Sequence, residues 1–317
     1  MSTTIDPTVT LGETDLDVSP LCLGGSVFGW TIDEARSFAI LDAYVESGGN
    51  FIDTADVYSA WASGNEGGES ETIIGRWMRA RGNRDRLVLA TKVGMIDGLS
   101  EEHVTAQIES SLRRLQTDRV DLYYAHRDDP RTPLESTLAA FNRLVQAGKV
   151  RYIAASNYDA ARLEAALETS RRDGTVAFAA LQPHYNLVER DGFEGELEDV
   201  CTRHGLPCLP YFPLAAGFLT GKYERNRTVA GERAEAVEGY MNERGWSALA
   251  ALRRCATARR LSPAAIALAW LASRPTVAAP IASVTSLDQL RSLLAFLDVD
   301  LTPDEIADLD AASAPAP

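Results

Sequence analysis

The sequence lacks the features that mark disulfide-bonded, metal-binding and membrane proteins. Its 317 residues contain no apolar run of transmembrane length, and the N-terminus has no signal-peptide pattern. The four histidines show no ligand spacing, so we expect no metal site. The cysteines show no metal or redox spacing either, and we expect them to be small buried or half-buried residues: Cys22, Cys201, Cys208 and Cys255. We therefore expect a soluble, cytoplasmic protein.

Positive charge is also scarce. The net charge is −14 and the pI is near 4.8, and no basic stripe stands out along the chain. Proteins that bind nucleic acids or anionic membranes concentrate Lys and Arg on one face, so we expect neither partner. The expected partner is a small molecule, and the sequence predicts no particular oligomeric state.

Lysine is the rarest charged residue. Lys and Arg total 31, but only Lys92, Lys149 and Lys222 are lysines. Arginine stays charged in proteins, whereas lysine can shift its pKa and offers a compact ammonium group. Lys149 lies in the turn-like sequence QAGKV, and we assign it no chemical role. Lys92 ends a strand-like segment and is a candidate for chemistry.

Strand-like and helix-like stretches alternate along the chain. The expected strands are residues 21–25, 51–55, 87–93, 120–126, 150–156, 178–185, 207–212 and 277–281. Helical patterns occupy residues 33–47, 70–81, 101–115, 134–147, 159–171, 193–203, 246–259, 263–272 and 286–295, followed by a C-terminal helix that starts near residue 302. This alternation predicts an α/β fold, a closed (β/α)8 TIM barrel, in one domain over residues 1–317. An open doubly wound sheet is the main alternative, but LGGSVFGW does not match its GxGxxG turn.

Three further segments flank the expected barrel. The N-terminal sequence VTLGETDLDVSPLCLG predicts a β-hairpin that caps the barrel bottom. Residues 223–245, rich in Arg, Glu and Gly, predict a mobile loop on the side of the active site. The terminal sequence AASAPAP is expected to be frayed.

Four side chains of compatible chemistry recur at the ends of successive strand-like segments. Tyr58 follows Asp53 by five residues, Lys92 follows Tyr58 by 34, and His126 follows Lys92 by 34. Because the carboxyl ends of parallel strands point to one face, we expect these four residues to converge in one pocket. Taken singly, Asp53 could be a turn residue, Tyr58 a surface aromatic and His126 an ordinary strand-end histidine. The four residues together are less well explained by a chance arrangement than by a shared site.

These residues make a coherent proton-donating unit. A free tyrosine has a pKa of about 10, and a neighbouring ammonium group favours its phenolate. A carboxylate keeps a buried lysine protonated, and a histidine can orient a substrate oxygen through a hydrogen bond. The unit suits protonation of an alkoxide during carbonyl reduction, for which a cofactor must supply the hydride.

Specific motifs span nearly the whole chain. They are LGETDLDVSPLCLGG, FIDTADVY, ATKVG, RRLQTDRVDLYYAHRDD, LVQAGKVRYIAASNY, LQPHYNLVER, YFPLAAGFLTGKY and, more weakly, PIASVTSLDQL. In combination they resemble the aldo-keto reductase superfamily. The resemblance implies a (β/α)8 barrel that reduces aldehydes and ketones with a nicotinamide cofactor, usually NADPH. It implies that Tyr58 is the general acid, Lys92 tunes it, Asp53 holds Lys92, and His126 orients the carbonyl.

The same resemblance implies residues that bind the cofactor. Four match the residues that hold the nicotinamide: Ser156, Asn157 and Gln182 by hydrogen bonds to the carboxamide, and Tyr211 by stacking on the ring. Three more match the loop that wraps the pyrophosphate, a motif closed by Lys222: Leu214, Gly217 and Leu219. As alternatives, Asn157 could cap a helix, Gln182 could satisfy a strand end, and Tyr211 could belong to the core.

Two regions depart from the family pattern. Phe212 replaces the serine that commonly follows the stacking tyrosine. In the last strand–helix loop, Ser283 stands at the usual glycine, Thr285 replaces the arginine that binds the 2′-phosphate of NADPH, and Gln289 is retained. Thr285 or Ser283 could hydrogen-bond a phosphate without adding charge, and Arg291 is a possible substitute. The expected cofactor is NADP, with NAD as the alternative.

The sequence gives the least information about the substrate pocket. Phe28 and Trp30 follow the first strand and Trp61 follows Tyr58, so all three could line the mouth and favour apolar or aromatic carbonyls. Packing in the core or on the surface is the alternative. The reaction could also run in reverse on an alcohol or sugar. A non-catalytic cofactor-binding subunit, like the potassium-channel β subunits of this superfamily, is the alternative from a different functional class.

Overall fold

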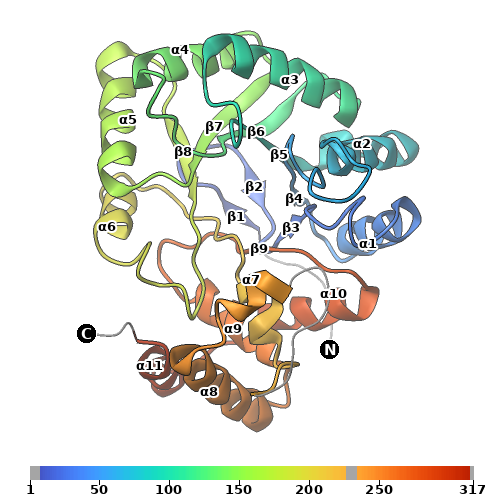
Figure 1. Cartoon of the computed structure of the whole chain (residues 1–317), viewed down its shortest axis with the longest axis vertical. Coiled ribbons are helices and arrows are strands. Elements are labelled where there is room, and N and C mark those ends of the chain that lie inside the picture. The colour runs from blue at the N-terminus through green and yellow to red at the C-terminus, as the bar shows by residue number, and fades with distance from the viewer. Residues whose placement is uncertain (1–7, 226–233, 315–317) are drawn as a thin grey trace.

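A parallel sheet of seven strands forms the centre of the computed structural model, which describes residues 8–225 and 234–314 (Figure 1). The strand order is β8-β7-β6-β5-β4-β3-β9. The strands are β3 (Cys22–Gly24), β4 (Phe51–Asp53), β5 (Val88–Val93), β6 (Val120–Ala125), β7 (Val150–Ser156), β8 (Phe178–Gln182) and β9 (Ile281–Ala282). Residues 226–233 of the expected mobile loop and residues 315–317 of the expected frayed tail lie outside the described part.

The segment around Cys208 closes the gap between β8 and β9. Cys208 forms parallel bridges with Leu181 of β8 and with Val277. The amide of Ile281 then donates to the carbonyl of Pro210 over 2.9 Å. The predicted (β/α)8 barrel is therefore confirmed, but its seventh strand consists of isolated bridges and its eighth is shorter than predicted. Proline has no amide hydrogen to donate to a ladder, and prolines stand within or beside both segments.

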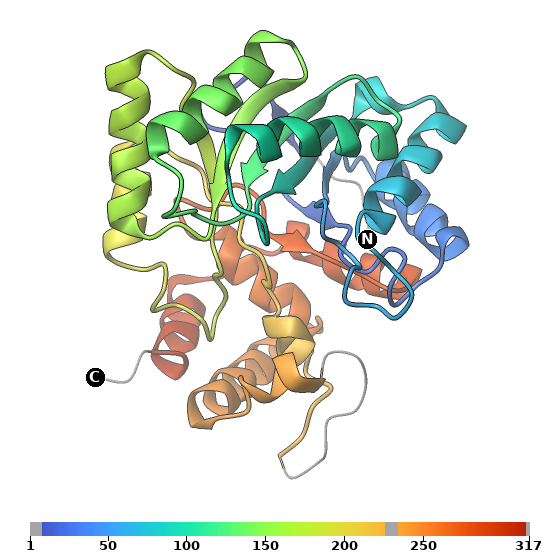
Figure 2. The same ribbon diagram turned by 45° about the horizontal axis from the view of Figure 1, so that its top comes forward.

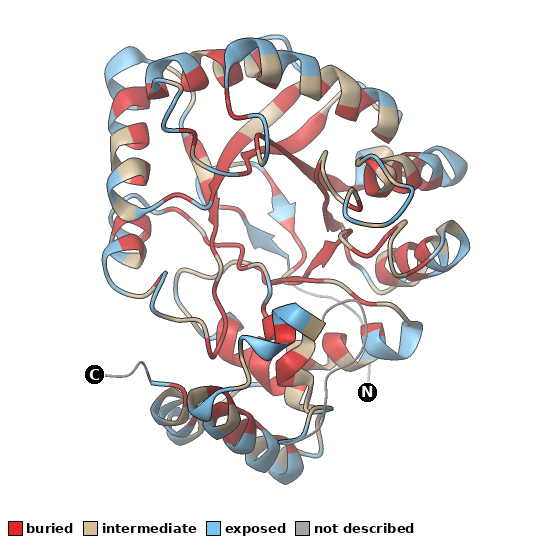
Figure 3. Ribbon diagram, in the orientation of Figure 1, coloured by how far each residue is buried: buried red, intermediate tan, exposed pale blue. Residues whose placement is uncertain are grey.

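Helices surround the strands and turn their exposed faces outward (Figure 3). The ring contains α1 (Glu34–Glu46), α2 (Glu69–Arg81), α3 (Glu101–Leu115), α4 (Leu134–Gln146), α5 (Ala160–Asp173), α6 (Glu196–Arg203), α9 (Pro263–Ala272) and α10 (Leu287–Leu294). Two more, α8 (Glu243–Arg259) and α11 (Pro303–Ala312), pack beside α9 at one side of the barrel (Figure 2). The predicted helices agree with these bounds to within a few residues. Among the described residues, no helix is long and apolar enough to cross a lipid bilayer.

Short helical turns lie outside the predicted pattern. They are η1 (Arg84–Arg86), η2 (Ala215–Thr220), α7 (Ala234–Glu238) and η3 (Ala295–Asp298). Both η2 and α7 lie after the seventh strand position, and α7 falls inside the segment expected to be a loop. Segments this short carry too few apolar positions to show a helical period in the sequence.

The predicted N-terminal hairpin is present and closes one end of the barrel. It pairs β1 (Val9–Thr10) with β2 (Asp17–Val18) in antiparallel register. Leu11 and Leu16 of the hairpin are buried in one hydrophobic cluster with Phe51 and Val88. Because Phe51 and Val88 begin β4 and β5, the hairpin covers the amino ends of the strands, as predicted. Polar side chains gather at the opposite, carboxyl end.

Candidate active site

A buried ion pair joins the carboxyl ends of β4 and β5. Lys92 is completely buried, and its Nζ donates to Oδ2 of Asp53 over 2.5 Å. The same ammonium donates to the carbonyl of Thr54 over 2.8 Å and to the hydroxyl of Tyr58 over 2.9 Å. All three ammonium donors are therefore used. The structure brings Asp53, Tyr58 and Lys92 together as the spacing predicts.

The electrostatic environment keeps the proton on Tyr58. Burial and the adjacent Asp53 carboxylate raise the pKa of the Tyr58 phenol well above its ordinary value. Burial also lowers the pKa of Lys92, while Asp53 opposes that shift. The sequence predicts that the Lys92 ammonium favours the phenolate, but burial and the Asp53 carboxylate outweigh that effect. The phenol releases its proton only to a strong base, such as an alkoxide, and the phenolate then forms within reach of Lys92.

His126, directly after β6, completes the tetrad of Asp53, Tyr58, Lys92 and His126. Its side chain is almost fully buried, and its ring centre lies 6.2 Å from that of Tyr58. Burial and the positive charges of Lys92 and Arg127 lower the pKa of His126 well below its ordinary value. The imidazole is therefore neutral at pH 7. A neutral imidazole carries one N–H group, which can hydrogen-bond a substrate oxygen.

A second cluster lies at the ends of β7 and β8. The side-chain amide of Asn157 donates to the backbone carbonyl of His126 over 2.8 Å, and its Oδ1 accepts from the Tyr211 hydroxyl over 2.9 Å. Ser156 donates to the carbonyl of Gln182 over 2.9 Å, and Gln182 donates to Asp53 over 3.1 Å. The four residues expected to hold the nicotinamide therefore adjoin the tetrad. Asn157 has a φ of 55°, a left-handed conformation that asparagine tolerates better than most residues.

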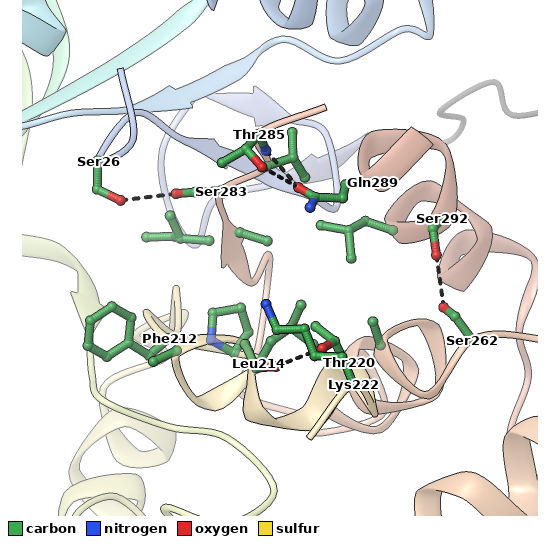
Figure 4. A pocket seen from close by; sticks show the side chains of 18 of the residues that line it. Ser26, Phe212, Leu214, Thr220, Lys222, Ser262, Ser283, Thr285, Gln289 and Ser292 are labelled. Carbon is green, nitrogen blue, oxygen red and sulfur yellow. Dashed lines mark hydrogen bonds between the residues drawn. The ribbon is translucent and has the colours of Figure 1, made fainter. Parts of the chain in front are cut away.

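A cavity of about 530 Å³, lined by Phe212, which follows Tyr211 in the chain, lies between η2 and the start of α10 (Figure 4). We call it the loop cavity, because loop residues form most of its wall. Of the expected cofactor residues, the following line it: Phe212, Leu214, Gly217, Ser283, Thr285 and Gln289. Gln289 accepts hydrogen bonds from the amide and the hydroxyl of Thr285, at 2.7 and 3.1 Å. Lys222 also lines the cavity and projects into it from the η2 side (Figure 4).

The backbone just before η2 and in its first residues is strained near the loop cavity. Phe212, Ala215 and Ala216 have φ values of 51°, 50° and 55°, which are unfavourable for residues with a Cβ. Gly217 follows with a φ of 101°, which glycine adopts without strain. Strain of about 1–3 kcal/mol per residue persists where surrounding structure enforces it, and it concentrates at ligand-binding segments.

The chemistry of the loop cavity fits a phosphorylated nucleotide. Hydroxyl groups of Ser26, Ser283 and Thr285 can donate to phosphate oxygens, and apolar side chains can cover a base. The amino end of α10 contributes a partial positive charge. Among the described residues, Lys222 is the only charged side chain in the wall. The donor set therefore fits the dinucleotide that the family resemblance implies.

Two of the expected site residues and one suggested substitute lie away from the site. Phe28 is completely buried in the hydrophobic core, so it does not line the mouth of the site. Leu219 is also completely buried and is absent from the wall of the loop cavity. Arg291 pairs with Asp288 at 2.9 Å on the surface and does not reach the cavity. Phe28 lies in a loop, Leu219 in η2 and Arg291 on α10, and the local backbone geometry, which the sequence pattern does not specify, decides the direction of each side chain.

Aromatic side chains stand at the mouth of the tetrad. Trp61 is 51% exposed, and its ring lies edge-on to Trp30 at 5.4 Å and to Tyr58 at 6.1 Å. Phe212, whose ring lies edge-on to Tyr211 at 5.4 Å, is 44% exposed. Trp61 therefore lies beside Tyr58, and Trp30 packs against Trp61, in the region where the sequence predicts a substrate wall.

Some residues of this region carried no signal in the sequence. Ser26 lines the loop cavity and contacts Ser283 at 3.2 Å, although they are 257 positions apart. His184 and Tyr240 lie beside Tyr211 and contact each other. Only the position of Ser26 just after the first strand could have drawn attention to it. In the described part of the chain, no group of three or more His, Cys, Asp or Glu side chains could hold a metal ion.

Comparison with known proteins agrees with this geometry. The Aldo/keto reductase family matches residues 20–314. An uncharacterized oxidoreductase, YrpG of Bacillus subtilis, is 34% identical over 305 residues, which cover 92% of this chain and 91% of that protein. A probable voltage-gated potassium channel subunit beta of Oryza sativa is 34% identical over 318 residues, 95% of this chain and 94% of that protein. Norsolorinic acid reductase stcV of Emericella nidulans is 33% identical over 313 residues, 92% of this chain and 78% of that protein.

Proposed function

Because this chain belongs to the aldo/keto reductase family of NAD(P)H-dependent oxidoreductases, we propose that it reduces aldehydes and ketones to alcohols, with Tyr58 as the proton donor. The observation that carries the proposal is the contact of 2.9 Å between Lys92 Nζ and the Tyr58 hydroxyl, within a buried ion pair. A phenol in contact with a buried ammonium suits proton donation to a developing alkoxide.

Each member of the tetrad has a distinct task. Tyr58 donates its proton to the substrate oxygen, and Lys92 stabilises the phenolate that remains. Asp53 keeps Lys92 charged against the effect of burial. Neutral His126 donates a hydrogen bond that orients the carbonyl. The reduced nicotinamide, when bound, supplies the hydride.

The cofactor is proposed to be NADPH, with NADH as the alternative. Asn157, Gln182 and Ser156 would hold the carboxamide, and Tyr211 would stack on the ring. The loop cavity would take the phosphates, with Lys222 as its cation. Calorimetric titration with NADPH and NADH tests the preference: tighter binding of NADPH supports it, and equal or tighter binding of NADH overturns it.

The proposed substrates are apolar or aromatic carbonyl compounds. Trp61 lies beside Tyr58 and Trp30 packs against Trp61, so both offer apolar surface near the proposed acid, whereas a sugar would need more polar partners. We expect kcat/KM for aromatic aldehydes to exceed that for aldose sugars at least tenfold, since about 1.4 kcal/mol of differential binding suffices. Equal or better use of sugars would overturn this substrate class and would favour the reverse, dehydrogenase reaction.

A non-catalytic cofactor-binding subunit is the second candidate. It is favoured by the similarity to proteins named as probable potassium channel subunits beta. Two measurements separate the candidates: turnover of NADPH with a panel of aldehydes and ketones, and co-purification of a partner protein. Turnover that Tyr58→Phe abolishes supports the enzyme, whereas tight cofactor binding without turnover, together with a co-purified partner, supports the subunit.

A further inference from the structure

His184 stacks on the ring of Tyr211. The two ring centres are 5.0 Å apart and the ring planes differ by 13°. The backbones of the two residues form a parallel bridge, and the amide of Tyr211 donates to the carbonyl of Pro183 over 3.0 Å. The stack is therefore built into the register between the end of β8 and the seventh strand position.

The imidazole of His184 is itself held from other sides. Its Nε2 and the hydroxyl of Tyr240 share a hydrogen bond of 2.8 Å. The ring of Phe212 lies edge-on to the imidazole at 5.8 Å, and the ring of Tyr240 lies edge-on at 6.3 Å. Tyr240, just after α7, is anchored by a backbone hydrogen bond of 3.0 Å to Val237. The imidazole therefore has little freedom to tilt or slide.

Tyr211 is thus constrained at two points. Its hydroxyl donates to Asn157 over 2.9 Å, which fixes the far end of the ring. In the described part of the chain, His184 is the only ring that lies parallel to Tyr211, so one face of the phenol is covered. A flat ligand ring can then stack only on the opposite face. Burial lowers the pKa of His184, which keeps the imidazole neutral and suited to stacking.

We propose that His184 is a positioning residue, which braces the covered face of Tyr211 so that the opposite face meets the nicotinamide at a fixed height and tilt. This rests on the proposed function, because it takes Tyr211 as the stacking partner of the nicotinamide. The brace acts on that ring alone. It makes no contribution to binding of the adenosine phosphates in the loop cavity.

Two ligands separate these effects. NADP+ carries the nicotinamide, whereas adenosine 2′,5′-bisphosphate carries only the other end of the cofactor. Calorimetric titration of full-length His184→Ala is expected to show five- to tenfold weaker binding of NADP+, the effect of losing one aromatic pair. Binding of the bisphosphate is expected to stay within about twofold of the wild-type value, a difference well under one tenfold step.

Two further substitutions isolate the ring from its hydrogen bond and serve if the alanine variant does not fold. His184→Phe keeps a flat ring against Tyr211 and loses the contact with Tyr240, so it is expected to bind NADP+ within about twofold of wild type. His184→Gln keeps a polar group near Tyr240 but has no ring, so it is expected to bind NADP+ as weakly as the alanine variant.

Three results would overturn the proposed role of His184. The first is wild-type affinity for NADP+ in His184→Gln, and the second is an equal loss of affinity for NADP+ and for the bisphosphate in His184→Ala. The third is loss of NADP+ binding in His184→Phe. Failure of the proposed function would look different, because it would appear in the wild-type protein. That protein would then turn over no aldehyde or ketone with NADPH or NADH, whatever its affinity for NADP+ and whatever the effect of the His184 substitutions.

Discussion

The tetrad and the loop cavity both lie at the carboxyl end of the barrel strands but are built in different ways. Asp53 and Lys92 sit on strands, are buried, and have every charged atom in a hydrogen bond. The loop cavity is lined mainly by side chains of loops and helix ends, and its hydroxyl groups bond to neighbouring hydroxyl, amide or carbonyl groups. Residues at the ends of buried strands have fixed positions, which suits groups that take part in the reaction. Loops tolerate changes in sequence, which suits groups that select the cofactor phosphate and the substrate. Substitutions should therefore act differently in the two regions.

The largest expected effect is on proton donation by the tetrad. Tyr58→Phe removes the acid and leaves the ring, so kcat is expected to fall by about 10²- to 10⁴-fold. The dissociation constant of NADPH should stay unchanged, because the phenol contacts Lys92 and Asp53 rather than the loop cavity. Steady-state kinetics and calorimetry measure the two quantities. Tyr152→Phe, which alters a hydroxyl near Asp15 at the other end of the barrel, is the matched control. Unchanged turnover in Tyr58→Phe would rule out this acid.

The second effect is on stability. Asp53→Asn leaves the completely buried Lys92 without a carboxylate, and the free energy of unfolding is expected to fall by about 3 kcal/mol. Asp288→Asn breaks the exposed ion pair with Arg291 and is expected to change the free energy of unfolding by less than about 0.5 kcal/mol. Urea denaturation compares the two variants. Equal losses would mean that burial does not distinguish these ion pairs.

A third expected effect is a pH dependence of the free energy of unfolding, which arises near the tetrad. Burial and the nearby Glu71 raise the pKa of Asp56 to about 7. The folded state then binds a proton more tightly than the unfolded state, so this stability is present at low pH and lost as the pH rises through 7. Between pH 5 and pH 7.5, wild type should lose about 2 kcal/mol relative to Asp56→Asn in urea denaturation. Parallel pH profiles of the two proteins would contradict the raised pKa.

The smallest expected effect lies in the loop cavity. Thr285→Arg adds a cation to a wall in which Lys222 is the only positively charged side chain among the residues that the structure describes. It is expected to tighten NADPH binding about tenfold while leaving NADH binding unchanged. Arg291→Ala should change neither affinity, because Arg291 pairs with Asp288 outside the cavity. Calorimetry with both cofactors tests this. Equal tightening of NADPH and NADH by Thr285→Arg would show that position 285 does not face the 2′-phosphate.

The barrel and the tetrad could be predicted because their signals are local. Short apolar runs at regular spacing mark the strands, and the residue at a strand end must appear at the carboxyl face of a parallel sheet. Asp53, Lys92 and His126 follow from that rule alone. The roles of the tetrad and of the nicotinamide cluster stay predictions, although their residues lie where the sequence places them.

Side chains in loops could not be predicted in the same way. Phe28 and Trp30 are two residues apart in one loop, yet Phe28 is buried in the core and Trp30 stands beside Trp61. Leu219 turns into the core, while Leu214 lines the cavity. No period of two or 3.6 residues governs an irregular segment, so the sequence does not state which face a side chain takes.

The sequence by itself determined the order of strands and helices and the meeting of Asp53, Tyr58, Lys92 and His126. Tertiary structure alone decided that burial and Asp53 keep Tyr58 protonated, and that His184 backs Tyr211. The physical reason is the separation in sequence between the residues that produce each effect. Backbone periodicity follows from neighbouring residues, whereas desolvation and ring stacking depend on groups that packing brings together from distant parts of the chain.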